Sequence, residues 1–429
     1  MKNWTRSLLS LALMATVACA AWAQTDPQQV LKEIQAARTK AVNDARASGS
    51  LDVDALNKLI QEKALAAIAG MDPATIPAKD AYAWAEVFSM AGKHKETCDL
   101  CAKFLTTNPD PQKTFDAKML MLNSCNALEE GHMLTMMVPT VEPPTPMASQ
   151  QFLSSVVYEF TETVAKQMSV DEALKMLASA ERNMKYEDPE AFAKRMVEAQ
   201  LKRTPDGDAE KLKAQYLATA KTQRGSLEFA IAERRAELLS DAGRSAEGKA
   251  ILEAFVAKTD PADATYRRAK GSLTRMSMVG AAAPALTVER GYGKFEGLES
   301  LKGKVVLLDF FAHWCGPCIN SFPDMKQMYA DLKPKGLEIV GFTTYYGYYK
   351  TERNLEKDAE YAKMKDFIAD HQLPWPVVYG ERSNFDAYGV TGIPHVTVIG
   401  RDGTVHSVKI GYSPATFKKF REEIEKLLG

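Results

Sequence analysis

The sequence predicts a chain of two parts, in which an all-helical first part is followed by an α/β second part. In residues 24 to 280, apolar residues recur at spacings of three and four, and glycine and proline fall mostly between the apolar runs. In residues 281 to 429, short apolar runs alternate with amphipathic stretches. Such alternation is typical of a mixed sheet with helices on both faces. The predicted fold class is therefore α+β for the whole chain.

The start of the chain has the pattern of a removable signal peptide, residues 1 to 23. Lys2 and Arg6 precede an apolar core from Leu8 to Ala18, and Ala21-Trp22-Ala23 is a small-x-small cleavage site. The apolar core is too short for a comfortable membrane span. We therefore expect secretion into the periplasm.

Composition agrees with a soluble globular protein of more than one domain. With 46% apolar and 25% charged residues among 429, the chain can bury two or three ordinary cores. The formal net charge of −1 gives no support for nucleic-acid binding. Thr16-Val17-Ala18-Cys19 is a poor lipoprotein signal because its first position usually carries leucine. A lipid anchor at Cys19 is therefore the less favoured alternative.

One segment of the first part resembles a tetratricopeptide-type helical repeat. It comprises residues 81–92, with Gly92 at the turn, then residues 98–105 and a closing Pro109. Residues 229–261 are a weaker echo of the same pattern. Two echoes in so long a region indicate a degenerate helical solenoid. A proline-rich run is expected to divide this solenoid into two halves, near residues 139–150.

Such a helical region is expected to bind a client or partner protein. Each helix pair buries one face on its neighbours and leaves a concave surface free. The alternative is that the region only packs against the second part of the chain or dimerises.

Three cysteines of the first part, Cys98, Cys101 and Cys125, have three interpretations. The simplest is that they are small buried core residues. A structural disulfide joining Cys125 to Cys98 or to Cys101 would suit an oxidising compartment. A soft-metal site would use them with His94 and the histidine and methionines of residues 132–137. No metal site is predicted.

The second part carries two thiols three positions apart, Cys315 and Cys318. They lie where the apolar run 305–311 gives way to the amphipathic stretch 315–332. At a helix start, unpaired N–H groups and the positive end of the macrodipole favour a thiolate and lower the pKa expected for Cys315. Cys315 is thus the predicted attacking sulfur, and Cys318, one turn on and facing inward, the resolving thiol. A zinc site would need two more ligands, which the neighbouring sequence does not supply.

Four further motifs accompany the cysteine pair. They are Ala283-Pro284-Ala285-Leu286, the run from Leu301-Lys302-Gly303-Lys304 to Phe311, Phe322-Pro323, and Tyr388-Gly389-Val390-Thr391-Gly392-Ile393-Pro394. With the cysteines, these motifs resemble the thioredoxin superfamily, and within it the TlpA-like thiol-disulfide oxidoreductases of the bacterial envelope. The resemblance covers about residues 281 to 429 and implies a thioredoxin fold for them.

The resemblance also implies roles for residues around the pair. Pro394 occupies the position of a cis proline, whose bond with Ile393 would hold a backbone edge against the sulfurs for a substrate segment to pair with. Asp309 occupies the position of an aspartate that helps to move the proton of the resolving thiol, and the alternative is a purely structural core acid. The expected substrate-binding residues are Trp314, Gly316, Pro317 and Ile393.

The dipeptide between the cysteines predicts the direction of the reaction. Gly316-Pro317 is the dipeptide of thioredoxin, whose potential is about −270 mV, whereas the strong oxidant DsbA lies at about −120 mV. This gap corresponds to roughly 7 kcal/mol in a two-electron couple, so we expect a reductant or isomerase. His313 is a departure, since an imidazolium near the sulfurs would raise the potential. We expect His313 to point to solvent.

The elements expected in the second part follow its apolar pattern. The stretch Thr343 to Lys350, which holds four tyrosines, follows a central strand, where loops of such folds carry function. It either lines a substrate groove beside Cys315 or fills the space under the next helix. The expected elements are a hairpin over 286–298, strands over 305–311, 337–344, 376–379, 396–399 and 405–410, and helices over 315–332, 359–371 and 414–428.

These inferences predict a thiol-disulfide oxidoreductase that reduces disulfides of envelope proteins through Cys315 and Cys318, without a metal or other cofactor. The family resemblance implies that a membrane electron donor recharges the pair. One alternative is a thiol peroxidase, although the proline and the threonine or serine of its pattern are missing before Cys315. The other is a helical scaffold whose redox domain is accessory.

Overall fold

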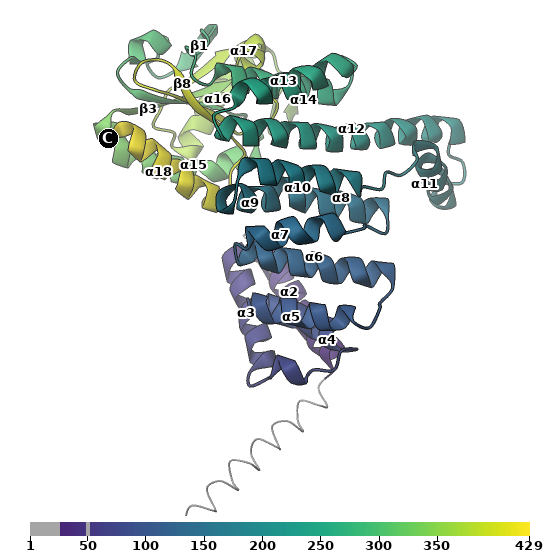
Figure 1. Ribbon diagram of the computed structural model, residues 1–429. Helices are drawn as coiled ribbons and strands as arrows, with labels where there is room; N and C mark the ends of the chain where they lie inside the picture. The colour runs from purple at the N-terminus through teal and green to yellow at the C-terminus, as the bar shows by residue number, and fades with distance from the viewer. Residues whose placement is uncertain (1–25, 49–51) are drawn as a thin grey trace, which may run out of the picture. The chain divides into compact units, whose positions relative to one another are not determined.

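The structure, a computed structural model, describes residues 26–48 and 52–429 (Figure 1). The predicted signal peptide and Cys19 lie outside the described residues. By the proximity of its Cα atoms, the chain divides into two compact units between Ala220 and Lys221. The first is helical, and the second combines helices with a six-stranded sheet of the thioredoxin type. The predicted fold class, a helical region followed by a thioredoxin fold, is confirmed.

Local capping signals start many helices of the first unit. Asp110 accepts the N–H of Lys113 at 2.9 Å, and Pro111 takes the first helical position, where its missing N–H costs nothing. Gly92, with φ of +74°, makes the turn between two predicted helices. The helices are α2 (Pro27–Ser48), α3 (Val53–Ile68), η1 (Pro73–Thr75), α4 (Ala81–Met90), α5 (His94–Leu105), α6 (Pro111–Ala127), α7 (Gly131–Met137), η2 (Val138–Thr140), α8 (Pro146–Ser155), η3 (Val156–Phe160), α9 (Thr161–Gln167), α10 (Val170–Arg182), α11 (Pro189–Arg203) and α12 (Ala209–Asp241).

The division between the units falls inside α12, so the end of that helix belongs with the sheet, as do α13 and α14. The predicted domain boundaries, at residues 280 and 281 and near residues 139–150, stay predictions. Helices of the second unit are α13 (Ser245–Lys258), α14 (Ala264–Met278), η4 (Leu298–Leu301), α15 (Gly316–Leu332), η5 (Lys333–Lys335), α16 (Lys357–His371), α17 (Ser383–Ala387) and α18 (Pro414–Leu428).

The sheet of the second unit has the strand order β1-β6-β3-β2-β7-β8. β2 runs parallel to β3 and antiparallel to β7, so it is an inner strand with neighbours on both sides. The strands of this sheet are β1 (Val288–Tyr292), β2 (Val305–Phe310), β3 (Leu337–Thr343), β6 (Val377–Gly380), β7 (His395–Ile399) and β8 (Val405–Ile410), and β4 (Tyr348–Tyr349) pairs with β5 (Glu352–Arg353) beside it.

Each face of this sheet has its own apolar core. On one face, side chains of α15, α16 and α18, among them Phe322, Phe367 and Ile424, pack against Leu307 of β2. On the other face, Leu308 of β2 packs with Met278 and other residues. The alternation of β2 side chains between two cores explains why the whole strand is apolar except at one position.

The predicted hairpin over residues 286–298 is wrong. A single strand forms, β1, and it pairs antiparallel with β6. Gly293 and Gly297 have φ values of +81° and +91° and turn the chain into the short helix η4 instead of a second strand. α17 and the β4–β5 pair were not predicted.

The helices of residues 26–48 and 52–429 include none with the length and apolarity needed to cross a membrane.

Candidate active site

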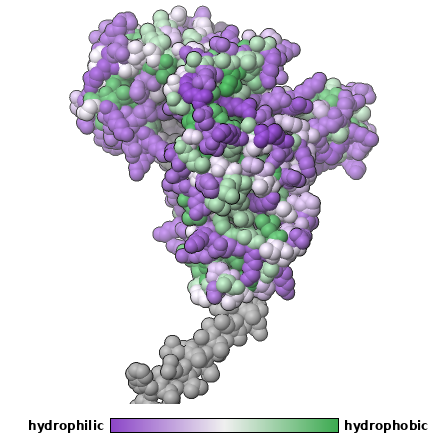
Figure 2. Space-filling model, in the orientation of Figure 1, coloured by the Kyte–Doolittle hydropathy of each residue, from purple (hydrophilic) through white to green (hydrophobic). Residues whose placement is uncertain are grey.

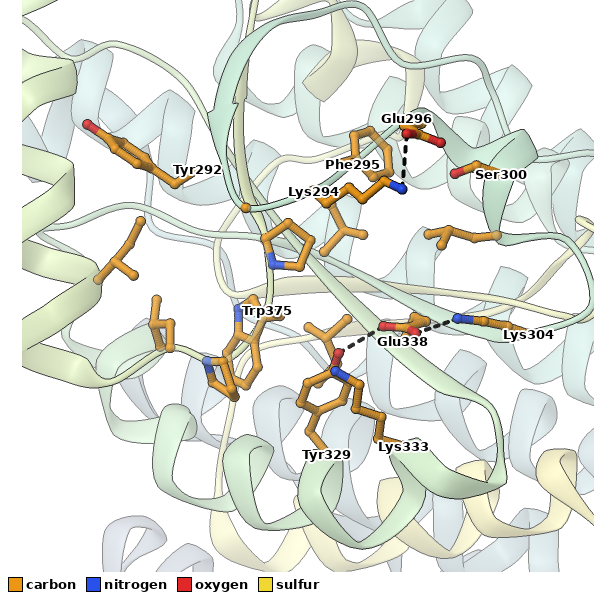
Figure 3. A pocket seen from close by; sticks show the side chains of 18 residues that line it. Tyr292, Lys294, Phe295, Glu296, Ser300, Lys304, Tyr329, Lys333, Glu338 and Trp375 are labelled. Atoms are coloured by element: carbon orange, nitrogen blue, oxygen red, sulfur yellow. Dashed lines mark hydrogen bonds and ion pairs between the residues drawn. The ribbon is translucent and has the colours of Figure 1, made fainter.

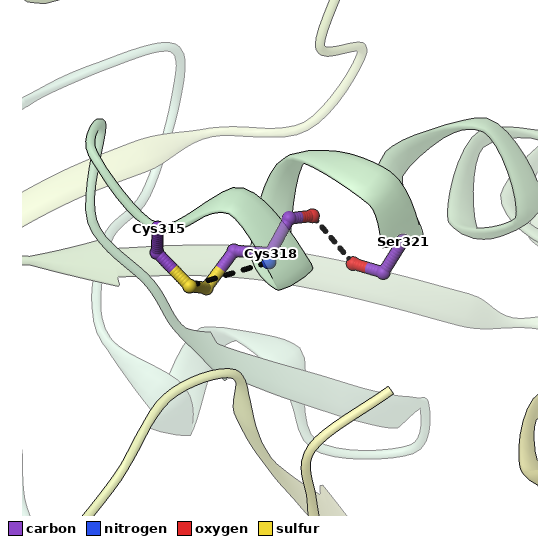
Figure 4. The surroundings of a disulfide bond; sticks show 3 residues. All are labelled: Cys315, Cys318 and Ser321. Carbon is purple, nitrogen blue, oxygen red and sulfur yellow. Dashed lines mark hydrogen bonds between the residues drawn. A yellow bond between two sulfur atoms is a disulfide. The ribbon is translucent and has the colours of Figure 1, made fainter. Parts of the chain in front are cut away.

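The predicted cysteine pair forms a disulfide at the start of α15 (Figure 4). Cys315 is the N-cap residue, and its sulfur accepts the backbone N–H of Cys318 at 3.2 Å. Cys318 is fully buried, as predicted from its inward position, and Cys315 is 4% exposed. Ser321 donates its hydroxyl to the carbonyl of Cys318 at 2.7 Å. The sulfur of Cys315 thus receives a donor from the helix terminus.

Strand β2 leads the chain to this helix start, and all six of its residues are buried. Leu307 and Phe311 belong to the core that contains both cysteines. Side chains two residues apart on a strand share a face, so Asp309, which lies between them, faces that same core.

Asp309 is buried, with 2% of its surface exposed. Removal from water disfavours the carboxylate, and this burial raises the pKa of Asp309 to about 7. A carboxyl with a pKa of this value can give up or take a proton near neutral pH.

The loop before β7 lies beside the disulfide. The bond between Ile393 and Pro394 is cis, as the resemblance implies. His395, the next residue, pairs with Phe310 at the end of β2. Ile393 packs against the core that includes Cys315 and Cys318. The end of β2 and the start of β7 therefore bring the cis proline and the cysteine pair to the same edge of the sheet.

Comparison with known proteins agrees with this geometry. Residues 278–427 match the Redoxin family. The chain is 32% identical over 134 residues to the thiol-disulfide oxidoreductase ResA of Bacillus thuringiensis, which covers 31% of this chain and 70% of ResA. ResA of Bacillus subtilis is 32% identical over 133 residues, 31% of this chain and 67% of that protein. The chain belongs to the ResA family of thiol-disulfide oxidoreductases.

Solved structures are similar to about a third of the chain. A thiol:disulfide interchange protein of the thioredoxin family from Chlorobium tepidum is 26% identical, with a TM-score of 0.27, and covers 34% of this chain and 96% of its own. The Redoxin match begins at residue 278.

The expectation that His313 points to solvent is wrong. Its side chain is 3% exposed, and its ring centroid lies 5.2 to 5.8 Å from those of three tyrosines of the following loop. Burial lowers the pKa of His313, so the imidazole is neutral at pH 7. His313, the departure from the thioredoxin pattern, therefore adds no positive charge beside Cys315 and Cys318. The three tyrosines that contact the His313 ring are Tyr346, Tyr348 and Tyr349.

A buried carboxylate holds the tyrosine loop in place. Glu360 of α16, whose side chain is 1% exposed, accepts the N–H of Tyr346 at 2.9 Å and that of Gly347 at 2.7 Å. The ring of Tyr346 lies 5.3 Å from that of Trp314, which is 49% exposed. Tyr345 packs at 4.6 Å on Tyr379. The loop therefore supplies Tyr345, which packs on Tyr379, and Tyr346, which lies next to Trp314.

Sequence reasoning missed Arg275, which connects α14 with the cis-proline loop. Its guanidinium donates to the carbonyl of Gly389 at 2.7 Å and to the hydroxyl of Thr391 at 3.3 Å. It also pairs with Glu233 of α12 at 3.1 Å, where the side chains of Arg275 and Glu233 are 13% and 23% exposed. A Cβ on Gly271 of α14 would lie 2.3 Å from a methyl group of Thr391, so helix and loop are in close contact. Arg275 precedes the matched region, and no local pattern marks it.

Two cavities of the second unit lie at different places on the ResA-type domain. One, of about 340 Å³, adjoins the cis proline. It is mostly apolar and is lined by Pro394, Ser321, Met325, Ile410, Tyr412 and Phe417, among others. This cavity lies next to the active-site helix.

The other cavity, of about 550 Å³, lies where β2 and β3 begin, whereas the disulfide follows the end of β2 (Figure 3). Four of its five charged residues are paired within it. Glu338 binds Lys304 at 2.6 Å and accepts the hydroxyl of Tyr329 at 2.8 Å, and Lys294 pairs with Glu296 at 3.3 Å. Nothing in this arrangement links the cavity to the cysteine pair.

In the part of the chain that the structure describes, no three His, Cys, Asp or Glu side chains are grouped to hold a metal ion.

Replacing Asp309 by asparagine is expected to raise stability at pH 8 by up to about 4 kcal/mol and to change it little at pH 4. The ordinary pKa of aspartate is 3.8, and the folded protein holds that of Asp309 at about 7. Between these values the folded state keeps a proton that the unfolded state has lost, so the stability of the natural protein falls as pH rises. Urea unfolding of the oxidised proteins at pH 4, 6 and 8 measures the difference. The exposed Asp386 offers a control, since the same change there should leave the profile unaltered. Parallel profiles for Asp309→Asn and the natural protein would contradict the assignment.

Replacing Arg275 by alanine is expected to lower the free energy of unfolding by about 2 to 4 kcal/mol. The change leaves Glu233 without its ion-pair partner, with the Ser272 hydroxyl still donating to it, and removes the donor to Gly389. Hydrogen exchange should accelerate most at Val390 to His395, beyond the change in global stability. Lys270→Ala, on an exposed face of the same helix, should change neither quantity. Equal acceleration at all amides would show that Arg275 contributes only global stability.

Proposed function

We propose that this protein is a disulfide reductase of the cell envelope that acts through Cys315 and Cys318, with its helical first unit recruiting the client. In the proposed cycle, the Cys315 thiolate attacks a client disulfide and forms a mixed disulfide. Cys318 then attacks Cys315, which releases the reduced client and leaves the Cys315–Cys318 disulfide. A membrane electron donor would return two electrons to the pair. The helix start supports the nucleophilic role of Cys315.

The observation that carries this proposal is the different setting of the two sulfurs. Cys315 lies at the helix N-terminus and accepts an N–H group, which stabilises negative charge on its sulfur in the reduced state. Cys318 is fully buried one turn on, where a client disulfide cannot approach it. This asymmetry supports attack by Cys315 and resolution by Cys318.

Asp309 is proposed to accept the proton of Cys318 during resolution. The carboxyl faces the core that holds both cysteines, and burial raises its pKa to about 7. A base works best when its pKa lies near the working pH, and this value meets that condition.

The cis-proline loop and the cavity beside it are the proposed seat of the client. Ile393 would offer its backbone to an extended segment of the client. The cavity of about 340 Å³ is apolar on Met325, Ile410 and Phe417, and could take a hydrophobic client side chain next to the disulfide. Trp314, half exposed beside Cys315, would cover the other side of the bound segment together with Gly316 and Pro317.

The proposed direction is reduction of the client. Gly316-Pro317 is the thioredoxin dipeptide, and the buried, neutral His313 adds no charge that would oppose it. We expect a reduction potential closer to about −270 mV than to about −120 mV. The signal-like start of the sequence and the ResA relatives support a place in the envelope.

Replacing Cys315 by serine is expected to reduce turnover of a protein disulfide to the uncatalysed rate. Cys318→Ser should instead accumulate a mixed disulfide with the client, because attack proceeds and resolution cannot. Intact mass spectrometry detects that adduct, and equilibration with glutathione buffers gives the potential. Cys101→Ala, which removes a buried thiol of the first unit, is the matched control and should retain activity. Adduct formation by Cys315→Ser, in place of Cys318→Ser, would reverse the assigned roles.

The first unit supports recruitment through apolar side chains that reach its surface. Methionine adapts its shape to different partners and is frequent at binding surfaces that accept several of them. Figure 2 shows apolar residues among the hydrophilic ones on the visible face. The exposed large apolar residues on α7 to α9 and their connections are Met133 (38%), Met136 (57%), Met147 (81%), Tyr158 (62%) and Met168 (41%).

The double variant Met136→Glu/Met147→Glu is expected to raise KM for a protein client by about ten-fold, which corresponds to a loss of about 1.4 kcal/mol of binding free energy. Its kcat/KM for a small disulfide such as cystine should not change, because a small molecule needs only the second unit. Gln150→Glu adds a charge to the same helix as Met147 and serves as control. Equal losses on both substrates would reject recruitment by these side chains.

A further inference from the structure

The first unit contains a second pair of cysteines on neighbouring helices. α5 and α6 follow one another along the chain and lie side by side (Figure 1). Cys98 lies near the start of α5 and Cys125 near the end of α6. The sulfur of Cys98 is 3.9 Å from the carbonyl oxygen of Met121, one helical turn before Cys125. The largest influence on the pKa of each of these two thiols is the other thiol, which places the two sulfurs within interaction distance.

The third cysteine of the unit, Cys101, belongs to an apolar core that includes neither Cys98 nor Cys125. Cys101 is fully buried in a core with Trp84, Leu100 and Phe104. Of the two cysteines on α5, Cys98 is therefore the one in contact with Cys125. The structure thus distinguishes between the two pairings that the sequence left open.

The two thiols of the pair have different access to solvent. Cys98 is partly exposed, whereas Cys125 is 2% exposed. A disulfide in solution can reach the first sulfur and not the second. A reactive thiol at the surface with a second thiol behind it is the arrangement that thiol–disulfide exchange requires.

We propose that Cys98 and Cys125 form a second dithiol–disulfide centre, which is oxidised by exchange with a disulfide of a protein or a small molecule. The Cys98 thiolate attacks one sulfur of the oxidant and displaces the other as a thiolate. The Cys125 thiol then loses its proton and attacks the Cys98 sulfur, which forms the Cys98–Cys125 bond and releases the second thiolate. Two electrons pass to the oxidant, and the two protons of the dithiol end on its two released thiols.

The charges around the pair favour this order of events. Interaction with the Cys125 thiol lowers the pKa of Cys98, the exposed thiol. The pKa of Cys125 is raised by interaction with the Cys98 thiol and by burial. Glu130, whose backbone N–H donates to the carbonyl of Cys125 at 2.9 Å, also raises the pKa of Cys125.

Peptide mapping tests the pairing on the full chain. The protein is oxidised with glutathione disulfide, denatured, alkylated and digested with trypsin. Trypsin leaves Cys98 and Cys101 together in residues 96–103 and Cys125 in residues 119–166. We expect these two peptides to be cross-linked in the natural protein and in Cys101→Ala. The cross-link should disappear in Cys98→Ala and in Cys125→Ala, which leave the remaining partner free for alkylation.

Three outcomes would overturn the proposal. One is complete alkylation of Cys98 and Cys125 after oxidation. Another is a cross-link that survives Cys98→Ala and is lost in Cys101→Ala. The third is a link between two copies of the chain. A thermal scan adds a second readout, since reductant should lower the melting temperature of the Cys315→Ser/Cys318→Ser protein and should not do so when Cys98→Ala is added. Client reduction by the Cys98→Ala protein should be unchanged, so failure here leaves the role of Cys315 untouched.

Discussion

The burial of β2 between β3 and β7 is the constraint on which the active site depends. Every residue of the strand is buried, and its side chains divide between two cores. The backbone of β2 is hydrogen-bonded on both sides, so the chain can change direction only after Phe310. The short turn that follows delivers Cys315 to the N-cap of α15. Because β7 is the neighbour of β2, the same constraint brings Pro394 to that edge.

The redox site also depends on helices that precede the region matched by the Redoxin family, residues 278–427. Arg275 and Gly271 of α14 contact the loop at Gly389 and Thr391, five and three residues before the cis proline. Gly389 has a φ of +61°, and a Cβ there would lie 2.4 Å from the carbonyl oxygen of Gly271. A side chain at either glycine would push helix and loop apart. A chain cut at residue 280 would lose these contacts, so the part that positions the loop begins before the part that resembles known oxidoreductases.

Local signals in the sequence sufficed for much of the second unit. The change from an apolar run to an amphipathic stretch at Cys315 marked the start of α15, and the apolar run itself marked β2, because both features depend on neighbouring residues. The burial of His313 could not be found in this way, since it depends on Tyr346 and Tyr348, more than thirty positions away. The same is true of Arg275, whose partner Gly389 lies 114 positions along the chain. Contacts with residues far along the chain decide the positions of His313 and Arg275. The two-residue period of strands and the 3.6-residue period of helices do not reveal such contacts.

Two histidines are buried near the cysteine pair and carry no charge. Burial lowers the pKa of His313, and burial with the nearby Arg275 lowers that of His395 to about 3, so both imidazoles are neutral at pH 7. Asp309 is about half protonated at that pH. The N–H group that Cys318 donates to the Cys315 sulfur at 3.2 Å stabilises negative charge there. Negative charge is therefore favoured on Cys315 and disfavoured on the buried Cys318 until a base takes its proton. Burial and helix geometry therefore favour one sulfur over the other before Asp309 takes part.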